Sequence, residues 1–100
     1  MPQIYRYLGI IISFYSKEHL PIHVHGRFGE YESKAEIIMK EGVIVEIRIA
    51  NIKGKRPLPK TQMKNFIIFV EQYSDQIVEK WTDYFIRNKE IHIEKINKKV

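Results

Sequence analysis

The sequence contains no cysteine among its 100 residues. Disulfide bridges, thiolate metal sites and a cysteine nucleophile are therefore excluded. Long apolar runs are also missing, because none approaches the roughly 20 residues of a membrane-spanning helix. The first residues lack the apolar stretch of a secretion signal, so we expect a soluble, cytoplasmic protein with no membrane partner. The composition, 44% hydrophobic and 29% charged, predicts one globular domain over residues 1–100 and not a disordered chain.

Acidic residues are missing from one stretch in the second half of the chain. The last fifty residues hold eleven basic and six acidic side chains, whereas the first fifty hold six of each, so the net charge of +5 lies in the second half. No acid occurs between Glu46 and Glu71. The cations of this stretch that we expect on a loop and the helix after it are Lys53, Lys55, Arg56, Lys60 and Lys64. They predict binding of nucleic acid or of an acidic partner protein, the alternative being an ordinary solvated loop.

Short apolar runs with β-branched and aromatic residues dominate the first half of the chain. Turn residues separate five such runs, including a turn expected at 26–29. The runs predict strands within residues 4–50, and the last of them alternates clearly between apolar and polar positions. The expected strands cover residues 4–7, 10–15, 22–25, 31–39 and 43–50.

The hydrophobic period changes to that of a helix after a basic connection at residues 51–59. Pro59 suits the first turn of a helix, because its missing N–H needs no partner there. Ser74 and the acid that follows it resemble an N-cap, so residues 60–88 are expected to form two helices. Residues 91–96 alternate briefly and could return as an edge strand. The predicted fold is α+β in two layers, with an antiparallel sheet of four or five strands covered on one face by a C-terminal helical hairpin.

Three histidines within seven residues form the most distinctive chemical pattern. His23 and His25 share one face of a strand because side chains alternate, and His19 lies close to them in sequence. These three are the candidate catalytic residues, since paired imidazoles can exchange protons near neutral pH. His23 and His25 could instead bind Zn, Fe or Ni with a third ligand, and Glu30 or Glu32 could add a carboxylate. The alternative is that the histidines only occupy a solvated strand face.

Known enzyme patterns leave the type of function open. A His-x-His strand occurs in cupin metal sites, but those need a further Glu and His on paired strands, and the only later histidine is His92. RNA cleavage without a metal needs a base, an acid and a cation, which His23, His25 and a Lys or Arg would satisfy. Gly-rich phosphate loops, His-Glu-x-x-His and Gly-x-Ser-x-Gly are all absent. Three functions remain open, which are an enzyme, a nucleic-acid-binding protein and a protein-binding module. A homo-oligomer is possible for each of them. The sequence identifies no cofactor.

Motifs spread over most of the chain resemble those of one known family. They are Pro2-x-Ile4-x-Arg6, Phe14-Tyr15-Ser16-x-Glu18-His19, Pro21-x-His23-Val24-His25, Leu58-Pro59, Glu79-Lys80-Trp81 and Tyr84-Phe85. The family is the small prokaryotic group called domain of unknown function 4160, whose histidine pattern is matched at all three positions. The chain departs from that pattern at Lys17-Glu18, Leu20, Ile22 and Gly26. The resemblance implies a toxin–antitoxin-like component that acts with a small, antitoxin-like partner protein, in a family with no established activity.

Overall fold

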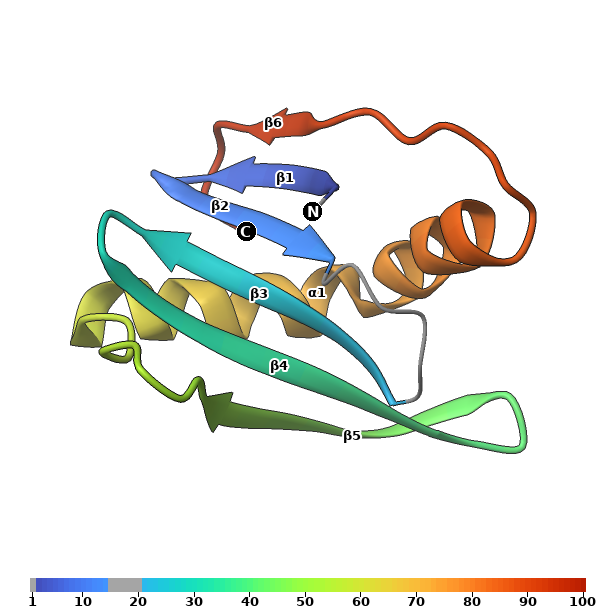
Figure 1. Cartoon of the computed structure of the whole chain (residues 1–100), viewed down its shortest axis with the longest axis horizontal. Coiled ribbons are helices and arrows are strands. Elements are labelled where there is room, and N and C mark those ends of the chain that lie inside the picture. Colours follow the sequence, from blue (N-terminus) through green and yellow to red (C-terminus); the bar gives the residue numbers. More distant parts are fainter. Residues whose placement is uncertain (1, 15–20) are drawn as a thin grey trace.

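A computed structural model describes residues 2–14 and 21–100 of the chain (Figure 1). Within these residues, six strands form one sheet in the order β5-β4-β3-β2-β1-β6, and the helix α1 covers one face of it. The α+β class and the two layers are therefore confirmed. The elements are β1 (Gln3–Tyr7), β2 (Ile10–Phe14), β3 (Ile22–Phe28), β4 (Tyr31–Lys40), β5 (Val43–Asn51), α1 (Lys60–Phe85) and β6 (Glu94–Ile96).

The strands β1 to β5 follow the expected runs and pair antiparallel with their neighbours. The turn expected at 26–29 is wrong, because β3 continues through Gly26 to Phe28 and a two-residue turn at Gly29–Glu30 leads into β4. Gly26 serves a close contact instead of a turn. A Cβ atom added there would lie 2.6 Å from ring carbons of Phe66, so the missing side chain lets α1 approach the sheet.

The expected helical hairpin is also wrong, because α1 is a single helix of 26 residues. The Ser74 hydroxyl does not cap a second helix and donates to the backbone carbonyl of Glu71 at 3.3 Å. No Gly or Pro interrupts this region, and apolar residues continue at helical spacing on both sides of Ser74, so nothing stops the helix. The fully buried residues of α1 are Phe66, Phe69, Val70 and Ile77. Trp81 and Phe85 pack partly buried against this core.

The strand β6 makes the sheet mixed, since it pairs parallel with β1. A single helix carries the chain back to the end of the sheet where β5 begins, so the next strand runs in the direction of β5 and β1. The predicted antiparallel sheet of four or five strands is thus corrected to a mixed sheet of six described strands. In the described part of the chain, no helix combines the length and the apolarity that crossing a membrane requires.

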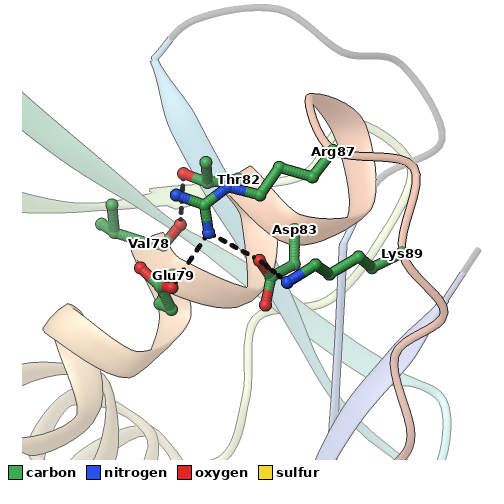
Figure 2. A network of polar contacts seen from close by, with 6 residues as sticks. All are labelled: Val78, Glu79, Thr82, Asp83, Arg87 and Lys89. Carbon is green, nitrogen blue, oxygen red and sulfur yellow. Dashed lines mark hydrogen bonds and ion pairs between the residues drawn. The ribbon is translucent and has the colours of Figure 1, made fainter.

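Polar contacts hold the end of α1 where the chain turns back toward β6 (Figure 2). The Thr82 hydroxyl donates to the carbonyl of Val78 at 2.9 Å. Arg87, just beyond the helix, contacts Asp83 at 2.8 Å and Glu79 at 3.1 Å through the same guanidinium nitrogen. Because these ion pairs are solvent-accessible, they orient the chain more than they stabilise the fold.

The hydrophobic core lies between α1 and one face of the sheet. The rings of Tyr5 and Tyr7 on β1 lie 5.0 Å and 4.7 Å from the ring of Phe69. Val24 on β3 is fully buried in the same cluster. Because Val24 and Gly26 face α1, the alternating residues of β3 face the other side of the sheet.

Candidate functional site

His23 and His25 lie on the face of the sheet opposite α1. Side chains alternate along β3, so His23, His25 and Arg27 point to this face, whereas Val24 and Gly26 point to the core. The ring centroids of His23 and His25 are 5.9 Å apart. His19 lies outside the described residues. The strand therefore brings two of the three predicted imidazoles together.

His25 forms the most buried polar contact of this face. Its Nδ1 atom lies 2.7 Å from Oε2 of Glu32, and both side chains are less than a tenth exposed. A carboxylate only accepts hydrogen bonds, so Nδ1 carries the proton and donates it. Nε2 is then the basic nitrogen of the ring, as in a histidine oriented for proton transfer or metal binding. Of the two carboxylates considered from the sequence, Glu32 makes this contact, whereas Glu30 is exposed in the turn.

His23 is oriented in the same way by the backbone. Its Nδ1 atom lies 3.0 Å from the carbonyl oxygen of Pro21. That oxygen is also only an acceptor, so His23 donates from Nδ1 and keeps Nε2 as its basic nitrogen. His23 is half-buried and His25 is buried, so His23 is the more accessible of the two rings. The site thus holds two neighbouring imidazoles that both donate a hydrogen bond from Nδ1.

Polar and cationic residues of adjacent strands surround His25. Ser13 of β2 and Lys34 of β4 lie directly opposite it in the strand register. Arg27, two residues along β3, is exposed and lies opposite Glu32. This face therefore combines two imidazoles with the carboxylates of Glu32 and Glu36 and the cations Lys34 and Arg27. Glu36 lies opposite His23, and its carboxylate is 4.0 Å from the ammonium group of Lys34. The face is suited to proton transfer at an anionic substrate.

Lys34 and Arg27 were missed by sequence reasoning as neighbours of the histidines. The signal that could have found them is the two-residue turn Gly29–Glu30, because turn length sets the register of a hairpin. Once that turn is placed, His25 faces Lys34 and Arg27 faces Glu32. With the turn expected at 26–29, the pairing of β3 with β4 could not be predicted correctly.

The metal hypothesis for His23 and His25 stays a prediction. Within residues 2–14 and 21–100, no group of three or more His, Asp or Glu side chains is arranged to hold a metal ion. Glu32 contacts Nδ1 of His25, so it orients the ring and leaves Nε2 as the nitrogen that would face a metal. A metal bound by both Nε2 atoms would need another ligand, and His19 is the candidate that the sequence suggested.

The basic connection meets the sheet beside Glu32. The backbone N–H of Glu32 donates to the carbonyl of Arg56 at 2.9 Å. Two residues after Arg56, the N–H of Leu58 donates to the hydroxyl of the buried Ser33 at 3.1 Å. These bonds fix the connection against the start of β4, the strand that supplies the carboxylate partner of His25.

The five predicted cations are exposed but do not lie on one side of the molecule. Lys53, Lys55 and Arg56 belong to the connection at the edge of the sheet, whereas Lys60 and Lys64 belong to the first turns of α1. Because α1 covers the face away from the histidines, Lys60 and Lys64 lie apart from the histidine site, whereas the connection meets the sheet at Glu32. None of the five forms an ion pair with another described residue, so all remain available to an anionic ligand.

Comparison with known proteins identifies one matching family. The family model described as Domain of unknown function (DUF4160) matches residues 9–82, which include His23, His25 and the basic connection. No curated protein and no solved structure matches the chain significantly.

Proposed function

The chain belongs to the family described as Domain of unknown function (DUF4160), and we propose that it binds RNA and cleaves it with its paired histidines. The observation that carries this proposal is the orientation of His25 by Glu32 at 2.7 Å, with the ring of His23 5.9 Å away. Two oriented imidazoles can take up a proton and release one in the same reaction.

The reaction uses the 2′-hydroxyl group of RNA as its nucleophile. One imidazole Nε2 removes the 2′-hydroxyl proton while the 2′-oxygen attacks phosphorus. The bond from phosphorus to the 5′-oxygen breaks, and the other imidazole, in its protonated form, donates a proton to the departing oxygen. The products are a 2′,3′-cyclic phosphate and a free 5′-hydroxyl group. In this proposal Lys34 and Arg27, which neighbour His25 on the same face, stabilise the negative charge that develops on the phosphate.

Binding of the polyanion is assigned to the basic connection. Lys53, Lys55 and Arg56 are exposed, and Arg56 is hydrogen-bonded through its backbone to Glu32, the residue that orients His25. In this proposal, an RNA strand held by the connection passes over the edge of the sheet onto the histidine face. Lys60 and Lys64, on the other side of the sheet, contribute only when a longer RNA passes around the edge.

The test uses labelled RNA oligonucleotides and matched oligonucleotides with 2′-deoxyribose, both in the presence of EDTA. We expect cleavage of RNA alone, with cyclic phosphate ends seen by mass spectrometry. His23→Asn and His25→Asn each keep a donor near the Nδ1 position but remove Nε2, so each is expected to lower the rate about 100-fold or more. His92→Asn is the matched control, because His92 is exposed and far along the chain from the site. Cleavage that is unchanged in both site variants would refute the proposal.

A partner protein is the second candidate ligand of the basic connection. Lys53, Lys55 and Arg56 are exposed, and an acidic, antitoxin-like protein that covers the site would also suit them, as in a cytoplasmic toxin–antitoxin-like system. Salt-sensitive binding to an acidic protein, with no binding to RNA, would replace the nucleic-acid proposal by this one. Native mass spectrometry with Zn, Ni and Fe tests the metal alternative, for which His23 and His25 would be ligands.

A further inference from the structure

The two edge strands of the sheet differ in length (Figure 1) and in the kind of side chains that they carry. The edge strand β6 has three residues and carries charged side chains at two of them. The opposite edge strand, β5, has nine residues and is largely apolar. Val43 and Val45 on this strand are 61% and 53% exposed. A long apolar edge of this kind offers unpaired backbone groups to another strand, whereas short charged edges resist such pairing.

The sequence of β5 is complementary to itself when two copies run antiparallel. With Ile47 opposite Ile47 of a second copy, facing residues have numbers that add up to 94. Ile44 lies opposite Ala50, and Val45, the extra residue of the bulge that β5 makes against β4, lies opposite Ile49. Apolar residues therefore meet apolar residues on both sides of the charged positions. Glu46 faces Arg48, and by symmetry Arg48 faces Glu46. Opposite charges that face each other across antiparallel strands stabilise the pair, whereas like charges destabilise it.

We infer that this protein forms a homodimer through β5, with Ile47 on the twofold axis. Glu46 and Arg48 are 51% and 56% exposed and lie 3.3 Å apart in one copy, so the dimer would gather two such pairs into a group of four alternating charges. The sheet would continue through both copies. The twofold axis that relates the two β5 strands is perpendicular to the sheet, so equivalent faces of the two copies point the same way. Both histidine pairs would therefore lie on one face of the dimer.

Charge exchange at β5 tests the pairing. Glu46→Arg places like charges opposite Arg48 on both sides of the twofold axis, and Arg48→Glu does the same with acids. Each single variant is expected to dimerise at least tenfold more weakly than the wild type in sedimentation equilibrium. The double variant Glu46→Arg/Arg48→Glu restores the dimer, and an equal mixture of the two single variants forms a heterodimer. A wild type that stays monomeric, or single variants that dimerise normally, would overturn the inference.

Cross-linking tests the register independently of these charges. The chain has no natural cysteine, so one introduced cysteine reports one position. Ile47→Cys is expected to form an interchain disulfide on mild oxidation, because residues directly opposite on antiparallel strands lie about 4.5–5.5 Å apart at Cα. Val43→Cys is the control. It is more exposed than Ile47, but eight residues along the strands separate it from its own copy, or about 26 Å. Cross-linking of Val43→Cys equal to that of Ile47→Cys would contradict this register.

Discussion

The ring of Phe66 on α1 lies directly over the backbone of Gly26 on β3, the residue after the second described histidine of the motif. A Cβ at position 26 would approach two ring carbons to 2.6 Å, which is too short for any real contact. The absence of one side chain therefore sets how closely the helix packs on the strand that carries the histidines.

Gly26→Ala is expected to destabilise the protein by about 1–3 kcal/mol, because an added methyl group in a packed core forces neighbours to move. Urea unfolding followed by circular dichroism measures this loss. Phe66→Leu removes part of the ring that the methyl group meets, so the double variant should lose less stability than the sum of the two single variants. Strictly additive losses would mean that Phe66 does not contact this position.

Glu32→Gln should separate the orientation of His25 from the stability of the fold. The amide oxygen can still accept the Nδ1 proton of His25, so the unfolding free energy should change little. The amide carries no charge, so it is a weaker partner for the imidazole, and activity is expected to fall about 10–100-fold. Glu32→Ala leaves the buried donor without its partner and is expected to cost about 1–3 kcal/mol as well. RNA cleavage rates and urea midpoints of both variants provide the test. Full activity of Glu32→Ala would exclude a role for this contact in catalysis.

Binding of RNA to the basic connection should depend strongly on salt. If about four cations contact phosphates, log K should fall with log salt with a slope of about −3 to −4. Replacing Lys53, Lys55 and Arg56 by Gln should reduce the magnitude of this slope by about 2–3. Fluorescence anisotropy at several salt concentrations measures it.

A control with the same change of net charge uses three exposed lysines of the C-terminal segment, which are Lys95, Lys98 and Lys99. Their replacement by Gln is expected to leave the slope close to that of the wild type, because they do not belong to the connection beside Glu32. Equal effects of the two triple variants would show a response to net charge alone.

Tyr5 should make the fold sensitive to alkaline pH. Burial, together with the nearby Glu94 carboxylate and Tyr73, raises the pKa of Tyr5 above its ordinary value of 10.0. The folded protein therefore keeps a proton that the unfolded chain releases, so the stability from this group is complete below pH 10.0 and is lost progressively above it. Urea midpoints should fall above that pH in the wild type and fall less in Tyr5→Phe. Tyr84→Phe is the control, since Tyr84 is 37% exposed, and it should follow the wild type.

Local sequence patterns were sufficient to predict several features of this protein. Alternation predicted the strands β1 to β5, and helical spacing after Pro59 predicted α1, because both periods follow from backbone geometry and need no tertiary information. The same alternation predicted that His23 and His25 share a face, and Glu32 was among the carboxylates considered. These predictions succeeded because residues close in sequence decide which way neighbouring side chains point.

Only the tertiary structure decided how these elements combine. A weak cap signal at Ser74 could not break α1, because its apolar stripe packs continuously on the sheet. The glycine at position 26 looks like a turn residue, and its role becomes clear only from Phe66, forty residues away in the sequence. Lys60 and Lys64 belong to the same run of cations as Arg56, but α1 lies on the opposite side of the sheet from the histidines. Contacts between distant segments, which no local period encodes, selected Glu32 as the partner of His25 and placed Arg56 beside it.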